Sequence, residues 1–262
     1  MNPTVAVIIS TYNASEHLAR VLDGYLAQSR PADELLVADD GSDWRTAKVV
    51  SEFASKARFP VSHVYQEDLG FRAAKIRNEA VKASSGEYLI FTDGDCVPHR
   101  RFVEDHVRIM RPGRFIQGKR MLVSKRTSTC LTRAGSLQLL KLCLKGEVSG
   151  CHHLVRLPGL TIRNKGLRGI KSCNFAVYRK DFLAVNGFNE DFVGWGREDS
   201  ELAVRLLKYG LTRRDAPFSA IVYHLWHKEN PKDALSRNDT LLAKAVQSSD
   251  FYCRNGISKR KT

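Results

Sequence analysis

Apolar runs alternate with helix-like segments from the start of the chain to Asp95, and this alternation restricts the fold more than any other feature. The apolar runs are VAVIIS, ELLVADD, VSHVY and EYLIF, and the segments between them are SEHLARVLDGYLAQ, WRTAKVVSEFASKA and RAAKIRNEAVKAS. Apolar strands joined by helices pair in parallel and bury both faces of their sheet. The sequence therefore predicts an α/β fold with a doubly wound, mostly parallel sheet and helices on both faces. The chain, with 262 residues of which 43% are hydrophobic, can bury a substantial core.

Polar clusters follow three of these apolar runs, at the point where each predicted strand ends. The clusters are STYN (Ser10–Asn13), DDGS (Asp39–Ser42) and TDGD (Thr92–Asp95). In doubly wound sheets, ligands bind beyond the carboxyl ends of the strands. We therefore expect the three clusters to converge on one edge of the sheet.

The pattern changes after about residue 112. RFIQGKRMLV predicts a strand, LTRAGSLQLLKLCLK a basic amphipathic helix and HHLVRLPGLTIRNKGLRG a loop. SCNFAVY predicts a strand, EDSELAVRLLKYG a helix with Gly210 as its C-cap, AIVYHLWH a strand that ends in histidines, and the tail from Lys232 one more helix. We divide the chain into two halves, residues 1–110 and 111–262, of one continuous domain.

The net charge of +14 is concentrated in residues 111–171, which hold fourteen Lys and Arg against one acid, Glu147. A basic surface of this kind attracts nucleic acid, anionic lipid headgroups or phosphorylated glycolipids. Nucleic-acid binding favours aromatic side chains among the cations, and this segment contains only Phe115. The composition therefore favours phosphates and lipid headgroups, and we expect no nucleic-acid partner.

The sequence also predicts the cellular compartment of the protein and the state of its cysteines. The chain passes directly from MNPT into VAVIIS without the features of a signal peptide, and no run of about 18 apolar residues occurs. Six widely spaced cysteines form no CxxC pair, which argues against a disulfide framework and a structural zinc site. We expect a cytoplasmic protein with reduced, mostly buried thiols.

Asp93 and Asp95 leave the strand EYLIF two residues apart. On extended chain, side chains at i and i+2 point the same way, and paired carboxylate oxygens suit a hard cation such as Mg²⁺ or Mn²⁺. An Asp-Gly turn that closes a hairpin is the alternative interpretation. The position of the pair beside the other two polar clusters favours a metal site.

A second pair of acids, Glu198 and Asp199, begins a predicted helix, where acids also stabilise the helix dipole. Gly194 and Gly196 flank Trp195 just before it and allow close backbone approach, which leaves the aromatic face free to stack on a sugar ring. The segment as a whole predicts a binding site.

Histidines and cations complete the set of candidate residues. His224 and His227 end a predicted strand and could donate to the cation at Asp95, with one ligand expected and His224 the favoured one. Arg72, Lys75 and Arg77 follow Gly70 at a helix start that suits a diphosphate, although a solvated helix face competes for Lys75.

Together these motifs resemble the family 2 glycosyltransferases of the GT-A fold, with a Rossmann-like nucleotide-binding sheet. The motifs are STYN, DDGS, GFRAAKIRN, FTDGD and CNFAVYRKDFLAVNGFNEDFVGWGREDSEL. The last of them also resembles the carboxyl-terminal region of galactosyl- and N-acetylgalactosaminyltransferases. The resemblance runs from about Val5 to about Asn230 and implies that residues 1–110 bind a nucleotide sugar and residues 111–262 the acceptor.

The resemblance also implies roles for individual residues. It assigns the donor nucleotide to Thr11, Tyr12, Asn13, Asp39 or Asp40 at the uracil edge, Arg72, Arg77 and Asp93, the last facing the ribose or the metal. It assigns the metal, Mn²⁺ or Mg²⁺, to Asp95 with His224 or His227. It assigns the general base to Asp199 or Glu198, and sugar contacts to Gly194, Trp195 and Gly196.

The implied reaction is inverting transfer of a hexose or N-acetylhexosamine from a UDP-sugar to a hydroxyl of a glycan or glycolipid acceptor. The basic segment suits a phosphorylated acceptor or contact with an anionic membrane at the inner face of the cytoplasmic membrane. The expected role is synthesis of a bacterial lipopolysaccharide or capsule. A metal-dependent phosphoryl-transfer enzyme, with Asp93 as nucleophile, and a basic nucleic-acid-binding protein are the alternatives.

Overall fold

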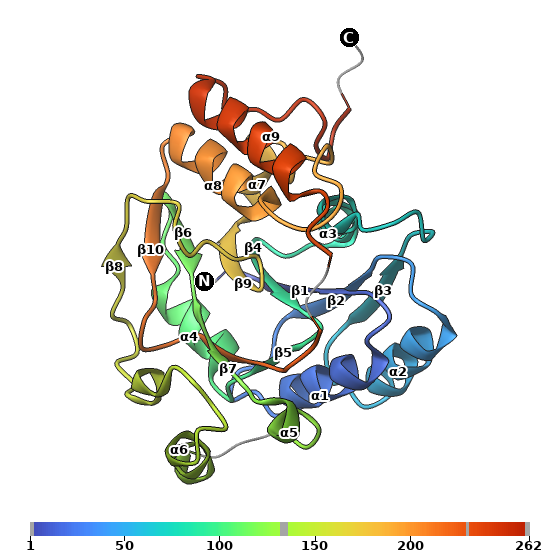
Figure 1. The fold of residues 1–262 in the computed structure, drawn as a ribbon, viewed down its shortest axis with the longest axis vertical. Helices are drawn as coiled ribbons and strands as arrows, with labels where there is room; N and C mark the ends of the chain where they lie inside the picture. The colour runs from blue at the N-terminus through green and yellow to red at the C-terminus, as the bar shows by residue number, and fades with distance from the viewer. Residues whose placement is uncertain (1–2, 132–135, 229–230, 260–262) are drawn as a thin grey trace.

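The computed structural model describes residues 3–131, 136–228 and 231–259 and contains one large and one small sheet (Figure 1). The strands are β1 (Val5–Thr11), β2 (Glu34–Asp39), β3 (Val61–Tyr65), β4 (Tyr88–Asp93), β5 (Cys96–Pro98), β6 (Arg114–Gln117), β7 (Lys119–Leu122), β8 (Ile162–Arg163), β9 (Asn174–Tyr178), β10 (Thr212–Asp215) and β11 (Ile221–His224). The helices are α1 (Ser15–Leu26), α2 (Trp44–Ala54), α3 (Ala73–Ala83), α4 (Phe102–Ile109), α5 (Lys125–Ser128), α6 (Ser136–Leu144), α7 (Arg179–Ala184), α8 (Glu198–Lys208) and α9 (Leu235–Gln247), with a 3₁₀ turn at Cys151–Leu154.

The large sheet has eight strands in the order β3-β2-β1-β4-β9-β6-β10-β8. Strands β1 to β4 pair in parallel, as their apolar sequences predict. Strand β9 runs antiparallel to β4 and β6 and joins the two halves of the chain into one sheet. Apolar side chains of α1 and α2 cover one face, and those of α3, α7 and α8 cover the other. The predicted α/β fold with helices on both faces is confirmed.

The small sheet has the order β5-β11-β7 and corrects the prediction of one strand over RFIQGKRMLV. That segment forms two strands because Gly118 interrupts it: its N–H donates to the carbonyl of Asn174 at 2.9 Å, and a Cβ there would lie 2.1 Å from the Asn174 Oδ1. β6 enters the large sheet and β7 the small one. The small sheet begins directly after the TDGD cluster, so it determines what lies beside Asp95.

The structure describes only part of the predicted basic helix. α6 begins at Ser136, and Arg133, one of the cations of the predicted helix, lies outside the described residues. No helix in the described part of the chain has the length and apolar character needed to cross a membrane.

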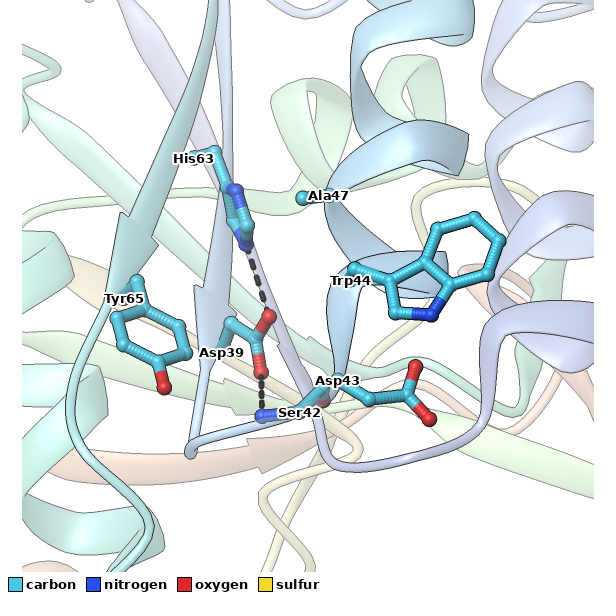
Figure 2. A pocket seen from close by; sticks show the side chains of 7 residues that line it. All are labelled: Asp39, Ser42, Asp43, Trp44, Ala47, His63 and Tyr65. Atoms are coloured by element: carbon cyan, nitrogen blue, oxygen red, sulfur yellow. Dashed lines mark hydrogen bonds and ion pairs between the residues drawn. The ribbon is translucent and has the colours of Figure 1, made fainter.

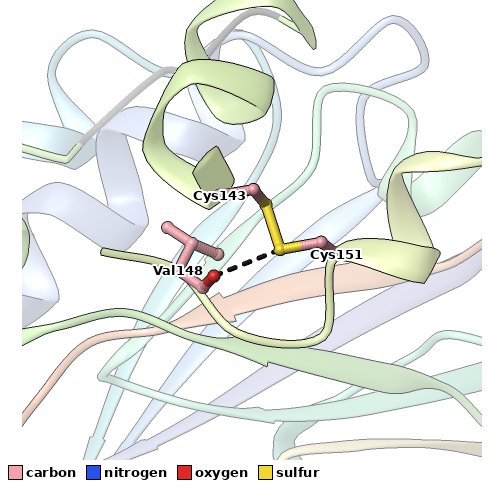
Figure 3. The surroundings of a disulfide bond; sticks show 3 residues. All are labelled: Cys143, Val148 and Cys151. Carbon is pink, nitrogen blue, oxygen red and sulfur yellow. Dashed lines mark hydrogen bonds between the residues drawn. A yellow bond between two sulfur atoms is a disulfide. The ribbon is translucent and has the colours of Figure 1, made fainter. Parts of the chain in front are cut away.

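The expectation that the cysteines are reduced is wrong for one pair: Cys143 and Cys151 form a disulfide (Figure 3). They lie only 8 residues apart in sequence, and the intervening chain turns at Gly146 and Gly150, both with positive φ, so that the two Cα atoms are 6.0 Å apart. The bond ties α6 to the 3₁₀ turn at Cys151–Leu154. Cys96, Cys173 and Cys253 are buried thiols, as predicted, whereas the free thiol of Cys130 is exposed.

Candidate functional site

The three polar clusters meet at one edge of the large sheet, as the parallel strand order predicts. Backbone hydrogen bonds link them: the N–H of Asp40 donates to the carbonyl of Thr11 at 3.0 Å, and the N–H of Gly94 donates to the carbonyl of Ser10 at 2.8 Å. Asn13, at a positive φ of 46°, donates its N–H to the Ser42 hydroxyl at 2.8 Å. The clusters therefore form one continuous rim.

Beside this rim lies a pocket of about 400 Å³ centred on Asp39 (Figure 2). Tyr65 and Trp44 lie on opposite sides of the Asp39 carboxylate, which accepts hydrogen bonds from His63 at 2.9 Å and from the Ser42 N–H at 2.8 Å. Burial raises the pKa of Asp39, but the hydrogen bonds from His63 and Ser42 outweigh it, so the pKa lies below its ordinary value. The pocket therefore has a fixed anionic acceptor between two aromatic side chains.

Asp40 has a different environment from its neighbour. Its carboxylate accepts from the N–H of Arg72 at 2.7 Å and from the side chain of Gln66, and it is 4% exposed. Burial raises its pKa against these hydrogen bonds. Asp40 thus fixes the start of α3. The sequence left open whether Asp39 or Asp40 contacts the uracil edge. Asp39 is the one that lines the pocket.

Tyr12 and Arg72 lie at the outer part of the rim. The Tyr12 hydroxyl donates to Asp68 at 2.9 Å, and its ring is 46% exposed. The guanidinium of Arg72 contacts the carbonyl of Glu67. Thr11 is buried, and a Cβ at Gly94 would lie 2.9 Å from the Thr11 Oγ1. A side chain between the two acids of the DGD motif would therefore displace Thr11.

Arg77 is a buried cation that bridges the two acid pairs. Its guanidinium donates to Asp93 at 3.0 Å, to Glu198 at 3.1 Å and to the hydroxyl of Ser10 at 3.0 Å. Burial lowers the pKa of Arg77, but Asp93 and Glu198 outweigh it, so the pKa lies above its ordinary value. The structure thus engages this guanidinium with carboxylates, whereas the sequence interpretation gave it a diphosphate.

The DGD motif does not follow the extended geometry that the sequence interpretation assumed. β4 ends at Asp93, a turn covers Gly94 and Asp95, and β5 begins at Cys96. Because of this turn the two carboxylates have different partners. Asp93 faces Arg77, while Asp95 lies within 4.8 Å of ring nitrogens of both His224 and His227.

Both histidines approach Asp95, where the sequence led us to expect one, with His224 favoured. The Nε2 of His227 lies 3.1 Å from the Asp95 carboxylate and that of His224 3.7 Å. β11 ends at His224, and the chain then leaves the strand, with the N–H of Leu225 bonded to the carbonyl of Asp95 at 2.8 Å. Because the chain leaves the strand here, His227, three residues after His224, also reaches the Asp95 carboxylate.

The residue types of this group suit a divalent cation. The hydrogen bond that His227 donates to the Asp95 carboxylate raises the pKa of His227 to about 9, whereas burial lowers the pKa of His224. The Nδ1 of His227 lies 2.8 Å from the carbonyl of Lys228, an outer contact typical of metal-binding histidines because it directs Nε2 inward. One carboxylate and two imidazoles suit Mn²⁺ better than Mg²⁺, which prefers oxygen ligands. The residues present therefore fit the implied metal.

Glu198 and Asp199 begin α8, as predicted, but they differ in exposure. Glu198 is 9% exposed and pairs with Arg77, while Asp199 is partly exposed and accepts from the N–H of Ser172 at 3.2 Å and that of Ser200 at 2.6 Å. Burial and the neighbouring charge of Asp199 raise the pKa of Glu198 to about 7. Burial also raises the pKa of Asp199, against the hydrogen bonds from Ser200.

The loop before α8 presents Trp195, with 39% of the residue exposed. Gly194 and Gly196 have φ values of 79° and 103°, and a Cβ at Gly194 would lie 2.5 Å from that of Ala234. From α9, the buried Asn238 donates to the carbonyl of Gly196 at 3.0 Å. Asn238 has no distinguishing motif in the sequence, and the sequence analysis missed it together with His63, Trp44 and Tyr65.

Comparison with known proteins decides the family. Residues 6–183 match the sequence profile of glycosyl transferase family 2. The chain belongs to this family. Residues 152–228 match a second profile, described as the N-terminal domain of galactosyltransferase, in the region where the sequence resembles such enzymes. Family membership argues against the two alternatives, a phosphoryl-transfer enzyme and a nucleic-acid-binding protein.

The relatives of this family 2 glycosyltransferase include larger enzymes. Chondroitin synthase of Escherichia coli is 27% identical over 274 residues, which cover 95% of this chain and 39% of the relative. Validoxylamine A glucosyltransferase of Streptomyces hygroscopicus subsp. limoneus is 28% identical over 236 residues, which cover 80% of this chain and 49% of the relative. The chain thus spans half or less of the length of these curated relatives.

Among solved structures, TarS 1–349 of S. aureus superposes with a TM-score of 0.65 at 17% identity, over 94% of this chain and 66% of that chain. A likeness of this kind shows a shared fold. It confirms the predicted GT-A fold for this family 2 member.

Removing the Arg77 cation tests its bridging role. Arg77→Met keeps much of the side-chain volume but leaves the carboxylates of Asp93 and Glu198 without their partner. We expect the free energy of unfolding to fall by about 3 kcal/mol, as measured by urea denaturation, because an unpaired buried charge is costly. The matched control is Arg45→Met, which breaks the exposed ion pair with Asp43 and should cost far less. Equal losses in the two variants would contradict the bridging role.

Proposed function

We propose that this chain is an inverting, metal-dependent glycosyltransferase that moves a hexose or N-acetylhexosamine from a UDP-sugar to a hydroxyl of a glycan acceptor. The observation that carries the proposal is the position of Arg77 between Asp93 and Glu198, 3.0 Å and 3.1 Å from them. One guanidinium contacts both acids, so the DGD motif and the acid pair of α8 lie close together. They are proposed to face a single cleft, in which a bound sugar would reach both.

The donor nucleotide has a candidate pocket beside Asp39. A uracil base offers an N–H to a carboxylate and a flat ring to aromatic side chains, and the pocket supplies Asp39, Tyr65 and Trp44 for these contacts. The backbone of Thr11 to Asn13 borders the same rim, with Arg72 beyond it. A second S. aureus TarS structure of the same fold is described as a complex with UDP, which supports a UDP donor.

The diphosphate is proposed to lie at Asp95, His224 and His227, which would hold Mn²⁺ or Mg²⁺. When bound, such a cation neutralises the charge that develops on the departing nucleoside diphosphate. Asp93 keeps the rim anionic next to the ribose, and its position is fixed by Arg77 and Ser10. Arg77 itself is proposed to orient the acids, which differs from the diphosphate contact expected from its place near a helix start.

Asp199 is the proposed general base. A base must reach the acceptor hydroxyl, and Asp199 is the more exposed acid, whereas Glu198 is buried against Arg77. Asp199 would accept the hydroxyl proton as that oxygen attacks the anomeric carbon from the face opposite the diphosphate. A single displacement with this geometry inverts the configuration at the anomeric carbon. The exposed face of Trp195, between Gly194 and Gly196, is proposed to stack on a sugar ring.

A polysaccharide role completes the proposal. The similarity to chondroitin synthase supports a glycan product, and we propose that the chain acts in bacterial lipopolysaccharide or capsule synthesis. The acceptor half would be residues 111–262 and the donor half residues 1–110. A glycolipid acceptor would require the enzyme to work at a membrane surface on the cytoplasmic side.

The first prediction concerns the metal. UDP together with Mn²⁺ should raise the melting temperature of the protein more than either does alone, because the native state alone binds both. Asp95→Ala should weaken metal-dependent UDP binding by roughly a hundredfold, since it removes the carboxylate of the group. Asp250→Ala, at an exposed position, is the control. If Mn²⁺ still strengthens UDP binding by the Asp95 variant as much as it does for the unmodified chain, the metal assignment is contradicted.

The second prediction separates the two acids of α8. Asp199→Asn should lower kcat by roughly a thousandfold and leave UDP binding unchanged, whereas Glu198→Gln keeps an oxygen for Arg77 and should lower kcat much less. The base must be deprotonated, and burial raises the Asp199 pKa, so activity should fall with falling pH at a pH above the ordinary range of aspartate. The reverse order of the two variants would move the base to Glu198.

The membrane proposal rests on α6. Leu137, Leu140 and Leu144 are 67%, 47% and 81% exposed, and Lys141 and Lys145 on the same helix end are exposed as well. Leucines at i, i+3 and i+7 share one face of a helix. Exposed apolar side chains with flanking cations suit an anionic lipid surface.

Vesicle sedimentation tests this surface. The chain should sediment with vesicles that contain phosphatidylglycerol at low salt, and less with phosphatidylcholine vesicles or at high salt. Leu137→Asp with Leu144→Asp should abolish the interaction, whereas Leu183→Asp on α7 should not. Absence of binding to anionic vesicles at low salt would end the membrane proposal.

A further inference from the structure

A second pocket, of about 200 Å³, has no part in the roles assigned above. It is lined by Gln117, Gly118, Lys119, Arg120, Gly169, Lys171, Cys173 and Asn174. Its floor is fixed by the buried Gln117, whose side-chain oxygen accepts from the N–H of Lys171 at 2.9 Å and whose amide donates to the carbonyl of Lys171 at 3.2 Å. The backbone that carries Lys171 is therefore held in place.

This pocket lies between the proposed base and the proposed metal ligands. On one side, Ser172, between the lining residues Lys171 and Cys173, donates its N–H to Asp199 at 3.2 Å. On the other side, the Cys173 thiol contacts that of Cys96, which in turn donates to Asp95 at 3.1 Å. An acceptor whose hydroxyl reaches Asp199 would therefore extend into this pocket.

Arg120 points to the same region from the small sheet. Arg120 is paired with Val222 in the register between β7 and β11, two residues before His224, so Arg120 and His224 share one face of the sheet. The Arg120 guanidinium lies 4.0 Å from the Cys173 sulfur, at the pocket wall. Arg120 is thus within the cleft, beside both the pocket and the histidines.

Among the residues that the structure describes, the positive charges around the pocket are only partly paired. Lys119 pairs with Asp215 at 2.9 Å, and Asp215 is also bound by Arg213 at 2.7 Å. Within residues 3–131, 136–228 and 231–259, neither Arg120 nor Lys171 has an acidic side chain within the 4.0 Å of an ion pair. A partly buried guanidinium without a counter-ion, beside a preformed pocket, favours an anionic ligand.

We propose that Arg120 and Lys171 bind a carboxylate or phosphate group carried by the acceptor sugar, an inference that rests on the proposed transferase function. The planar guanidinium fork matches either anion with two hydrogen bonds. The donor diphosphate has its own proposed site at Asp95 and the histidines, on the far side of the Cys96–Cys173 contact. The acceptor class is therefore an acidic glycan.

The test compares soluble sugars that differ in charge. Methyl β-D-glucuronide, methyl β-D-glucoside and glucose 6-phosphate are titrated calorimetrically into the full chain with UDP and Mn²⁺ present. At least one acidic sugar should bind about tenfold more tightly than the neutral glucoside, because a charge-assisted hydrogen bond has that effect. The glucuronide and the phosphate identify which anion the pocket takes. Rising salt should reduce the preference.

Variants test whether Arg120 and Lys171 cause the tighter binding of acidic sugars. Arg120→Gln and Lys171→Gln should each reduce this preference by about tenfold and leave UDP binding intact. Lys56→Gln, the same charge change at an exposed site in the loop after α2, should not alter it. Equal affinity for acidic and neutral sugars, including no binding of any, overturns the inference. So does a preference that survives in both variants, or a loss of UDP binding in Arg120→Gln, which would give the guanidinium to the donor.

The same titrations test the proposed transferase function separately from the inference about the acceptor. UDP and Mn²⁺ are titrated first, and absence of their binding to the unmodified chain would remove the transferase proposal. The sugars are then titrated without nucleotide, so that the acidic preference still decides the role of Arg120 and Lys171. Intact UDP binding without any acidic preference removes only the inference about the acceptor.

Discussion

The cleft depends on one buried cation. Arg77 is 4% exposed and reaches Ser10 on β1, Asp93 at the end of β4 and Glu198 at the start of α8. Burying a guanidinium away from water is unfavourable unless nearby negative charges compensate its positive charge, and two carboxylates at hydrogen-bond distance do so. Because Asp93 lies in the first half of the chain and Glu198 in the second, the two ion pairs fix the distance between the two acid groups. The buried ion pair therefore acts as a spacer.

This spacer also explains why α8 begins with two acids. Glu198 is held by Arg77 and is shielded from the cleft, while Asp199 accepts backbone N–H groups and stays partly exposed. The raised pKa of both acids follows from burial, yet their partners differ. Glu198 is thus tied to Arg77, whereas Asp199 is bound only by neutral N–H and O–H groups in the described part of the chain and is the acid proposed to act as base. An isolated acidic residue at this helix start could not provide both.

The sequence was sufficient to predict the rim but not its internal contacts. The clusters STYN, DDGS and TDGD meet because parallel strands place their carboxyl ends together, a rule that needs no side-chain detail. The bond between Arg77 and Glu198 spans 121 residues, and a cation near a helix start looks the same in sequence whether it faces phosphate or carboxylate. The Cys143–Cys151 disulfide was missed for a related reason, since turns at two glycines, not a spacing motif, bring its ends together.

Strand register accounts for the histidines. β5 follows the DGD turn at once, and its Cys96 pairs with His224 of β11, so that register alone sets His224 beside Asp95. A strand of three residues such as β5 is too short for its sequence pattern to predict it. Without β5, the sequence could not show whether one histidine or both would lie beside Asp95. The same small sheet brings Arg120 to the cleft on β7. The small sheet thereby places the candidate metal ligands and Arg120 near one another.

The loop that carries Trp195 is held in place by a helix, α9, that neither family profile covers. The profiles end at residues 183 and 228, yet the loop that carries Trp195 is held by Asn238 of α9 and by the ion pair of Arg197 with Asp239. Arg197, like Gly194 and Gly196, has a positive φ, a conformation that needs outside support in a residue with a side chain. A buried Asn that caps exposed carbonyls supplies that support. The acid pair directly after this loop therefore depends on α9 for its position, so this helix belongs to the site as much as the motifs do.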